Sequence, residues 1–590
     1  MSLYTASRIH KPTYFRLAPL IRGRGFRRPY IIGFDSEAER GKPFLFQFAH
    51  PDGSCDLLDI GIDKHAGLEE FCLYLFDHCK SKDTEYIVFG FNLQYEWTQL
   101  FRDLPNEAKD ANTILVDLTI RGAKTVISLV AMNEKRYMMT ATMGKTHRRI
   151  KFLDAMAYFP TSLDAASKII GIGAKLPKPA EFTRKAARTP AFEAYARQDA
   201  ILTQKLGEWI IGLHEQYDVP SCMSAPHFAA RTFRKCYLTS EILLPSETLE
   251  QYGLDSYHGG KNGFYLPKPA FLRNIWHYDI RSAYPEAMRQ LPNVEKSEWI
   301  ATDHYIPDTH AIYEITGNYT RCKHKTFLGR GSDWIKPGPF YRLRVTSYEL
   351  DTALILGEVS LNECIGWILK GPSGGPLVRY VDDFYTMKRN ATTDAERTTA
   401  KLFLNSLYGK FFQKVPLGDV TMVDLDTGKM IFTDPSQRWD YEAGGLYHPP
   451  IASLITGFVR AKMHRLEHKY ESLMTSTDGF FARIPPDPAD LGDALGNLTA
   501  EIGALRIWRE RLYIFRPFSK SRQIYAMHGF RGTLSQLERM PLRAGNTFSY
   551  TATAMVTLRM SLRRFDGRTY GAGEFVELPF AVKLATAEGP

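Results

Sequence analysis

Two short apolar runs near the front of the chain limit what this region can fold into. Residues 30–34 (YIIGF) and 86–91 (YIVFGF) have the continuous apolar character of buried strands. Between them, 67–79 (GLEEFCLYLFDHC) places apolar side chains at helical spacing. A strand, a helix and a strand in this order predict an α/β layer.

The rest of the 590-residue chain alternates helical patterns with turn-rich breaks, and its length suggests several domains. Glycine and proline gather at 257–269 and at 371–376 (GPSGGP), which we interpret as breaks between regions. Helical patterns occupy 190–215, 378–412 and 450–474, and a β-like run follows at 475–482. The expected fold class is therefore α/β and α+β, with more than one domain.

Charge and cysteine usage narrow the class of protein. The formal net charge is +10 and the pI about 9.0, which fits either a polyanionic partner or ordinary surface charge. The seven cysteines form no CxxC pair, so a zinc ribbon or knuckle is not indicated and reduced thiols in a cytoplasm are expected. The apolar runs are too short to span a membrane, and the N-terminus has no signal-peptide core. The sequence therefore predicts no membrane association.

A basic arm is expected at 1–29, because no acid appears before Asp35. Two interpretations stay open: contact with nucleic acid or a partner, and a solvated leader. Its basic residues are Arg8, Lys11, Arg16, Arg22, Arg24, Arg27 and Arg28.

Two aspartates stand in contexts that suit a metal-dependent reaction on phosphates. In 277–285 (HYDIRSAYP), Asp279 follows apolar and aromatic residues that predict a strand, and the next turn would offer N–H groups to phosphate. Tyr284 would lie under the sugar of a bound nucleotide, where a ring leaves little room for a 2′-hydroxyl. The segment 475–480 (TSTDGF) supplies a second carboxylate, Asp478, in a hairpin-like context.

Basic and polar side chains between these aspartates complete the set. Lys401, Asn405 and Tyr408 recur at i, i+4 and i+7, so one helical face should present all three. Lys401 can meet a triphosphate as a point charge, and Lys388, three to four turns upstream on the same helical pattern, can add a second contact. Phosphoryl transfer needs divalent ions on oxygen ligands together with such cations.

A second carboxylate set lies in the first third of the chain. Two of its acids are at i and i+2 on one side of a strand end, and a tyrosine and an acid at i and i+4 share a helical face. This pattern predicts a second two-metal site, for hydrolysis. The residues are Asp35, Glu37, Asn92, Tyr95, Glu96, Tyr195 and Asp199.

The downstream motifs resemble those of the family B DNA polymerases. HYDIRSAYP is similar to their DxxSLYP motif, with Ala283 in place of leucine, and 401–410 (KLFLNSLYGK) is similar to KxxxNSxYG. TSTDGF resembles YxDTD, with Ser476 at the first aspartate and Met474 at the leading tyrosine, and 257–260 (YHGG) resembles YxGG. The KxY element is matched only at Tyr525.

This resemblance implies roles for individual residues. Asp279, Asp478 and the carbonyl of Ile280 would hold two Mg²⁺ ions, for which Mn²⁺ can substitute. Nucleotide would bind Ile280, Tyr284, Lys388, Lys401, Asn405 and Tyr408. DNA would contact Tyr257, Gly259, Gly260, Ser282 and Tyr525.

The upstream set resembles the 3′–5′ exonuclease of the same family, with its DxE, NxxYD and YxxxD motifs. The resemblance implies metal ligands Asp35, Glu37 and Asp199, with Tyr195 orienting the attacking water. Asn92 and Tyr95 would hold a frayed single strand. Glu96 stands where the family has aspartate, so its carboxylate is displaced by one methylene.

Two long stretches, before and after 376–415, resemble insertions of the protein-primed branch of family B. The first would dock a terminal protein that supplies the priming hydroxyl, and the second would encircle the template. The implied fold is an RNase H-like exonuclease domain followed by a right-hand polymerase domain. The expected divisions are 30–220 exonuclease, 221–295 linker and palm, 296–375 first insertion, 376–415 fingers, 416–447 second insertion, 448–530 palm and 531–590 thumb.

The expected activity is therefore DNA synthesis with proofreading, on template and primer DNA with dNTPs. A terminal protein is expected to prime the synthesis. The chain is expected to act as a monomer, in a host cytoplasm if it is phage-encoded. Two alternatives stay open. Glu96 and Ser476 also fit a catalytically weakened DNA-binding relic, and the same fold could serve a primer-independent or repair polymerase.

Overall fold

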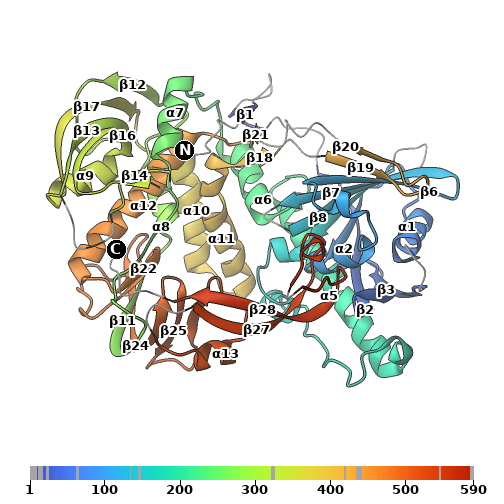
Figure 1. Cartoon of the computed structure of the whole chain (residues 1–590). Coiled ribbons are helices and arrows are strands. Elements are labelled where there is room, and N and C mark those ends of the chain that lie inside the picture. The colour runs from blue at the N-terminus through green and yellow to red at the C-terminus, as the bar shows by residue number, and fades with distance from the viewer. Residues whose placement is uncertain are drawn as a thin grey trace.

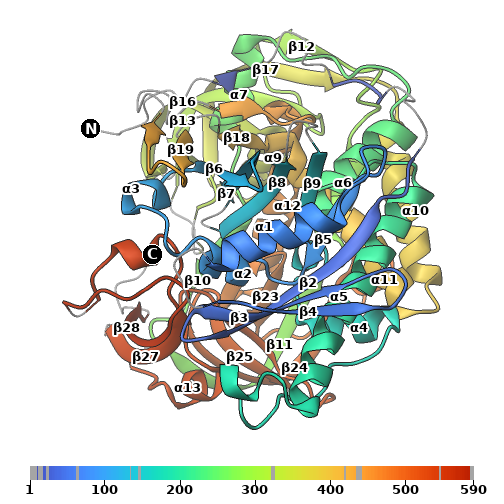
Figure 2. The ribbon, with the colours of Figure 1, turned by 90° about the vertical axis from the view of Figure 1, so that its right-hand side faces the viewer.

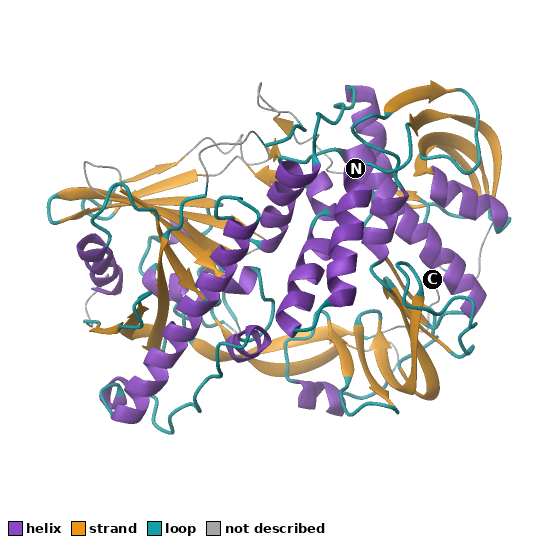
Figure 3. Cartoon of the chain, turned by 180° about the vertical axis from the view of Figure 1, so that it is seen from behind, coloured by secondary structure: helices purple, strands orange, loops and turns teal. Residues whose placement is uncertain are grey.

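The computed structural model describes residues 9–10, 17–20, 26–61, 66–132, 135–143, 148–320, 324, 326–331, 333–416, 420–432, 441–543, 547–565 and 567–584. Two bodies rich in strands flank a central group of helices, and a long C-terminal hairpin runs beneath these helices to the N-terminal body (Figures 1 and 3). Within the described residues, no helix combines the length and apolar character that crossing a membrane requires.

In the described chain, ten strands form the sheet of the N-terminal body, in the order β20-β19-β6-β7-β8-β9-β5-β2-β3-β4. The parallel pairs β2–β5 and β5–β9 lie at its centre. The strands are β2 (Tyr30–Glu39), β3 (Lys42–Ala49), β4 (Cys55–Asp59), β5 (Tyr86–Gly90), β6 (Thr113–Ile120), β7 (Ala123–Met132), β8 (Lys135–Met143), β9 (Arg148–Asp154), β19 (Val420–Asp424) and β20 (Met430–Phe432).

Helices cover both faces of this sheet because successive strand residues point to opposite sides. Ile31 packs into the core that includes α5, whereas its neighbour Ile32 packs into the core that includes α1. Figure 2 shows α1 on the side of the sheet that faces the viewer. The helices and turns of this body are α1 (Ala66–His78), α2 (Gln94–Leu100), α3 (Asn106–Lys109), η1 (Ala155–Ala157), α4 (Leu163–Ile170), η2 (Arg184–Ala186) and α5 (Pro190–Gln216).

Strand β2 is longer than the apolar run at 30–34 predicts. The sequence suggests a strand at 30–34 that ends in a carboxylate-rich turn, but β2 continues to Glu39 because β3 pairs along it. Asp35 lies opposite Gln47, and Glu37 lies opposite Leu45. Both carboxylates are therefore fixed on a paired strand rather than on a turn.

The expected basic arm is described only in part. Arg8, Lys11, Arg16, Arg22 and Arg24 lie outside the described residues. Arg28 contacts two acids of α5, with guanidinium nitrogens 2.6 Å from the carboxylates of Glu208 and of Glu215. This cation therefore binds the protein itself.

The C-terminal body contains an antiparallel sheet in the order β10-β22-β23-β11-β24-β25-β26. Tyr278 is fully buried in it and stacks on Phe480 of the neighbouring strand, with ring centroids 4.6 Å apart. The strands are β10 (Lys261–Phe264), β11 (Ala270–Ile280), β22 (Met474–Thr477), β23 (Gly479–Ala482), β24 (Leu498–Arg509), β25 (Leu512–Pro517) and β26 (Ile524–Met527).

The helical pattern at 378–412 is not one helix. The chain reverses at 391–393 and forms a pair of packed helices, α10 and α11, which Figure 1 shows at the centre of the molecule. Thr393 starts α11 through a capping box with Glu396, and this box sets the break. The central helical elements are α6 (Ala225–Thr232), η3 (Phe233–Tyr237), α7 (Glu247–Ser256), α8 (Ala283–Gln290), α10 (Pro376–Asn390), α11 (Asp394–Ser406), η4 (Tyr408–Phe412) and α12 (Pro449–Tyr470).

A smaller antiparallel sheet, in the order β12-β17-β13-β16, lies within the stretch expected as the first insertion. It has its own core around Tyr313, Ile315 and Leu350. Its elements and the short strands beside it are β12 (Glu298–Thr302), β13 (Ala311–Tyr319), β14 (Gly329–Arg330), β15 (Asp333–Trp334), β16 (Gly338–Thr346), α9 (Ser347–Ile355) and β17 (Val359–Lys370).

The stretch expected as the second insertion contributes to two sheets. Strand β19 pairs in parallel with β6, so this segment extends the N-terminal sheet, and Val423 enters that core. Residues 417–419 and 433–440 lie outside the described residues. The remaining strands of this stretch join a strand from the front of the chain: β1 (Ile9–His10), β18 (Lys414–Pro416) and β21 (Tyr441–Ala443).

The C-terminal segment is a long hairpin that reaches the N-terminal body (Figure 1). Phe575 contacts Tyr95, with ring centroids 5.9 Å apart. The Arg559 guanidinium donates to the carbonyl of Asp110 at 2.8 Å. The elements are α13 (Leu534–Arg539), β27 (Thr547–Met555), η6 (Met560–Leu562) and β28 (Phe575–Lys583).

Candidate functional site

The two expected aspartates meet at one end of the C-terminal sheet. Strands β11 and β23 are neighbours, with Asp279 opposite Gly479, and Asp478 forms the turn between β22 and β23. The Ile280 N–H donates to the Asp478 carbonyl at 2.9 Å. Thr477 takes a left-handed conformation, φ 61°, which lets the hairpin turn tightly.

The electrostatics of this pair fit a divalent cation. The pKa of Asp279 is raised to about 7, first by loss of hydration and then by the negative charge of Asp478, with Lys388 and Arg281 opposing. The pKa of Asp478 is also raised by desolvation. Two carboxylates that repel each other this way are stabilised by Mg²⁺ or Mn²⁺, which prefer oxygen ligands.

Cations from the helix pair approach the aspartates. Lys388, at the end of α10, donates to the Ser282 hydroxyl at 3.0 Å. Its pKa is lowered by burial and then by the nearby charges of Lys401 and Arg281. Lys388 reaches this position from the opposite helix of the hairpin, so its expected place three to four turns upstream on the helix of Lys401 is wrong.

Lys401 and Asn405 lie exposed on α11, one turn apart. Tyr408 is not on this helix, because α11 ends at Ser406 and Tyr408 begins the 3₁₀ turn η4. The expectation that one helical face carries all three is therefore correct for only two of them.

Tyrosine rings form a platform behind the aspartates. Tyr284 and Tyr408 stack face to face, with centroids 3.9 Å apart and planes 5° from parallel. Tyr257 stacks in the same way on Phe412, at 3.6 Å and 8°. The HYDIRSAYP and KLFLNSLYGK motifs thus meet through a ring stack, and YHGG meets the end of the η4 turn that follows the second motif.

Glycine is required at position 260 by close packing. A Cβ there would lie 2.6 Å from the Thr477 side chain, next to Asp478. The Gly259 carbonyl accepts from Arg460 of α12 at 3.0 Å. Tyr525 is 52% exposed on β26 and pairs through its backbone with Ile514.

Long-range contacts that the sequence does not predict hold α8 in place. Lys462 of α12 donates to both carboxylate oxygens of Glu286, at 2.7 and 2.8 Å, and to the Gly496 carbonyl at 2.8 Å. Arg281 donates to the Gly492 carbonyl at 2.6 Å. These partners are far apart in the sequence, so no local pattern marks them.

The second expected set lines a pocket of about 430 Å³ in the N-terminal body. Asp35 and Glu37 come from β2, and Tyr195 and Asp199 come from α5. The full lining is Asp35, Ser36, Glu37, Phe91, Asn92, Tyr95, Met156, Thr161, Ser162, Leu163, Lys175, Tyr195 and Asp199.

The acids of this pocket are strongly coupled. Burial, followed by the charge of Asp199, raises the pKa of Asp35 to about 7. Burial and the charges of Asp35 and Asp199 raise that of Glu37 to about 9. Asp199 Oδ1 is buried without a hydrogen-bond partner among the described residues. Oxygen donors that are crowded and unsatisfied in this way fit divalent cations.

Lys175 is the lysine that enters this pocket, a choice that the sequence left open. Its Nζ lies 2.5 Å from Asp199 Oδ2, whereas the Lys178 ammonium stands over the Phe182 ring at 4.1 Å. Lys175 thus neutralises Asp199 where a metal ion would otherwise do so.

Glu96 is close to this pocket but is not part of its lining. It is 3% exposed on α2, and its Oε2 has no hydrogen-bond partner in the described part of the chain. Burial and the charge of Asp35 raise its pKa well above the usual value. Its surroundings therefore favour the protonated form of Glu96.

Asp154 positions the neighbouring loop and was missed in the sequence. Its carboxylate accepts from the backbone N–H groups of Asn92, Leu93 and Met156 at 2.9, 3.1 and 2.9 Å. Asn92 adopts φ 65°, a conformation that these bonds stabilise. The one available signal was an acid at the end of an apolar run, 150–154.

Sequence comparisons find similarity to known DNA polymerases. The family described as DNA polymerase type B, organellar and viral, matches residues 185–434. A probable DNA polymerase of Agaricus bitorquis is 23% identical over 508 residues, covering 77% of this chain. The chain spans 58% of the length of that relative.

Solved structures of phi29 DNA polymerase share the fold. The orthorhombic crystal form has a TM-score of 0.61 at 15% identity, and the ternary complex with primer-template DNA and incoming nucleotides has 0.63 at 14%. Each match covers 94% of this chain and 100% of the phi29 chain.

The chain is therefore similar in sequence to type B DNA polymerases of the organellar and viral kind, and similar in fold to phi29 DNA polymerase. The resemblance to family B and the multidomain α/β and α+β fold class expected from the sequence are both confirmed.

Proposed function

We propose that the chain is a template-directed DNA polymerase that adds deoxynucleotides with two Mg²⁺ ions held by Asp279, Asp478 and the Ile280 carbonyl. The observation that carries this proposal is the meeting of Asp279, on β11, with Asp478, in the turn that leads into the neighbouring strand β23; Lys388 and Arg281 lie close enough to oppose the raised pKa of Asp279. The ions would activate the primer hydroxyl and neutralise the triphosphate.

The protein residues bind and orient the nucleotide. Lys388 and Lys401 attract the phosphates, and Asn405 lines the pocket on the same helix as Lys401. Tyr284, held flat against Tyr408, supports the sugar and excludes a 2′-hydroxyl. The backbone N–H groups around Ser282 face the phosphates, and Tyr257, Gly259, Gly260 and Tyr525 contact DNA.

The N-terminal pocket serves 3′–5′ proofreading in this proposal. Asp35, Glu37 and Asp199 hold the metal ions, Tyr195 orients water, and Asn92 and Tyr95 hold the unpaired 3′ end by stacking and hydrogen bonding. Glu96 acts through Asp35, because it is buried beside that carboxylate and outside the pocket lining. Lys175, which pairs with Asp199, would have to give up this contact for Asp199 to serve as a metal ligand.

The proposed divisions follow those expected from the sequence. They are exonuclease 30–220, linker and palm 221–295, fingers 376–415, palm 448–530 and thumb 531–590. The separate sheet at 298–370 supports an insertion that docks a terminal protein, since its core is its own. Protein priming, with the terminal protein as partner, rests on this arrangement. The monomeric state is also part of the proposal.

One assay tests both activities on the same molecule. A labelled DNA hairpin with a recessed 3′ end is incubated with the chain and Mg²⁺, with and without dNTPs. Lengthening with dNTPs and shortening without them are expected. Binding to the hairpin with neither reaction would favour the DNA-binding relic, which the substitutions Glu96 and Ser476 allow. Synthesis on unprimed template without a terminal protein would favour the primer-independent alternative.

A further inference from the structure

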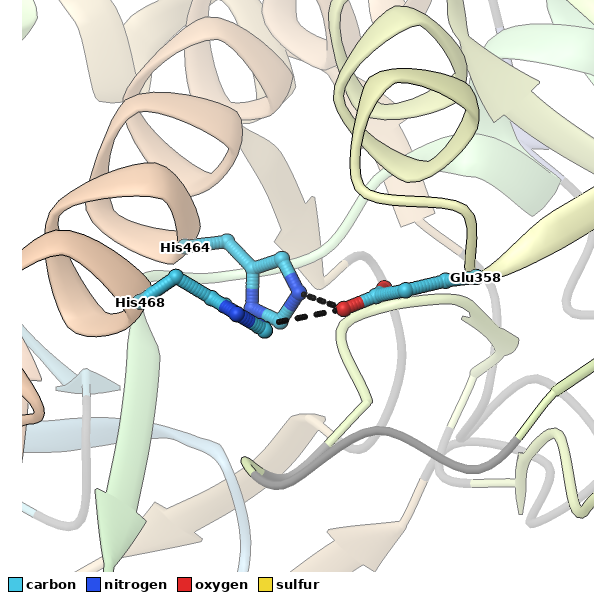
Figure 4. Close-up of side chains that lie close together, drawn as sticks. All are labelled: Glu358, His464 and His468. Carbon is cyan, nitrogen blue, oxygen red and sulfur yellow. Dashed lines mark hydrogen bonds and ion pairs between the residues drawn. The ribbon is translucent and has the colours of Figure 1, made fainter.

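A carboxylate and two imidazoles meet between α12 and the turn that precedes β17, away from both aspartate sites. His464 Nε2 lies 2.8 Å from Glu358 Oε1, and His468 Nε2 lies 3.1 Å from the same oxygen. Figure 4 shows both rings projecting from α12 toward this carboxylate. Nitrogen and oxygen donors from segments 106 residues apart therefore converge on one point.

We propose that Glu358, His464 and His468 form a zinc site that fastens α12 to the small sheet of 298–370. The potential ligand atoms all lie within 4.8 Å of one another. Tetrahedral zinc with bonds of about 2.0–2.2 Å holds its ligand atoms about 3.3–3.6 Å apart. The histidine nitrogens, 2.8 and 3.1 Å from Glu358 Oε1, would have to move from this oxygen by about 0.2–0.8 Å to reach that spacing.

The spacing on α12 presents both imidazoles to one ion. His464 and His468 are at i and i+4, which places their side chains one turn apart on the same helix face. Two imidazoles with one carboxylate favour zinc over Mg²⁺, which prefers oxygen ligands. This chemistry separates the cluster from the aspartate sites, whose donors are all oxygen.

The surroundings hold the ligands in position. His464 and Glu358 side chains are 0% and 3% exposed, and His468 is 26% exposed at the edge. Gly357, with φ 69°, turns the chain after α9, and the Glu358 N–H donates to the Ala353 carbonyl at 2.8 Å. The Glu358 carboxylate is therefore presented by a capped helix end rather than by a free loop.

The acid beside His464 suits a metal-bound histidine. His464 Nδ1 lies 3.4 Å from Glu467 Oε2, so Nδ1 can carry the ring proton and leave Nε2 for the metal. Glu467 is itself neutralised by an ion pair with Lys261. The other oxygen of Glu358, Oε2, is buried without a hydrogen-bond partner among the described residues. A buried carboxylate with one oxygen against two imidazoles and the other unsatisfied is a group that a cation would stabilise. The fourth position on the ion is assigned to water.

The test uses the full chain, stripped with a chelator and titrated with Zn²⁺ in excess Mg²⁺, which occupies the all-oxygen sites. His468→Gln removes one ligand at the partly exposed edge. His304→Gln is the matched control, because His304 is also beside an acid, Asp303, but lies exposed and outside the cluster. Zinc affinity and thermal unfolding are measured for each.

We expect the wild-type chain and His304→Gln to bind one equivalent of zinc and to gain thermal stability from it. His468→Gln should bind at least about tenfold more weakly and lose the stability gain. Added Co²⁺ should give tetrahedral visible absorption that His468→Gln lacks. The proposal is overturned if His468→Gln binds zinc as tightly as the wild type, or if neither zinc nor cobalt binds the wild-type chain at micromolar free metal.

Discussion

Tyr284 lies flat against Tyr408, with 3.9 Å between the ring centroids and 5° between the planes. Tyr284 is 9% exposed, so its ring is held by packing as well as by the stack. A ring fixed in this way can discriminate by shape, because it cannot swing aside to admit an extra hydroxyl.

Replacing the Tyr284 ring should relax sugar selection. We expect Tyr284→Ala to incorporate ribonucleotides about tenfold or more better relative to deoxynucleotides. Tyr284→Phe keeps the ring and should keep the selectivity. The measurement is kcat/KM for each sugar in single-nucleotide insertion. Unchanged selectivity in Tyr284→Ala would show that the Tyr284 ring does not select the sugar.

Lys401 is expected to act on the nucleotide rather than on DNA. Lys401→Ala should raise KM for dNTP about 10–100-fold, because a charged contact to phosphate is lost. Lys401→Arg should restore part of the affinity. Lys205→Ala, an exposed lysine of α5, should match the wild type. A loss of DNA affinity equal to the loss of dNTP affinity would contradict this role.

Trimming and synthesis should separate at the N-terminal pocket. Asp199→Asn should lower 3′–5′ trimming by about a hundredfold or more while extension persists, since one metal ligand is lost. Asp59→Asn, an acid paired with Arg188 at the end of β4, is the control.

Glu96 gives a finer test of the same pocket. Because burial and the charge of Asp35 favour the protonated form of Glu96, Glu96→Gln should keep trimming within about threefold of the wild type. Loss as large as in Asp199→Asn would show that Glu96 acts as an ionised ligand. Both rates are measured on one labelled hairpin.

The metal-free chain should become less stable as pH rises. Asp35 and Glu37 have folded-state pKa values of about 7 and about 9, above the ordinary carboxyl range, so the folded chain holds protons that the unfolded chain has released. Stability is present at acidic pH and is lost as pH rises through these values.

Thermal unfolding in chelator at pH 5, 7 and 9 measures this loss. Asp35→Asn should flatten the decline and raise Tm at alkaline pH by roughly 2–4 °C, whereas Asp59→Asn should follow the wild type. Added Mg²⁺ should reduce the wild-type decline. Two results would contradict the raised pKa values of Asp35 and Glu37. One is a wild-type Tm that rises with pH in chelator, and the other is the same dependence of Tm on pH in Asp35→Asn as in the wild type.

Local patterns in the sequence predicted the strands at 30–34 and 86–91 and the helix that carries Tyr195 and Asp199. Each of these elements depends on neighbours in the chain. The break before α11 also has a local signal, the box of Thr393 and Glu396, that the apolar periodicity concealed. The pairing of β11 with β23 brings together Asp279 and Asp478, which only the motif resemblance, and no local pattern, had linked.

Contacts between distant segments could not be predicted in this way. The pairing of β19 with β6, the Lys462–Glu286 ion pair and the approach of Glu358 to α12 join residues more than 100 positions apart. Their formation depends on how whole domains pack, and a single sequence carries no periodic signal for it. The end of α11 at Ser406 was also not predicted, because the helical spacing of Lys401, Asn405 and Tyr408 continues beyond the end of the helix.

The central claim is that Asp279 and Asp478 together hold the catalytic metal ions. The most direct measurement is single-turnover nucleotide addition to a primed template by Asp478→Asn, with Asp487→Asn as a control acid that pairs with Lys469. We predict a loss of at least about a thousandfold in Asp478→Asn with DNA binding retained, and wild-type rates in the control. Addition by Asp478→Asn within tenfold of the wild type would contradict the claim.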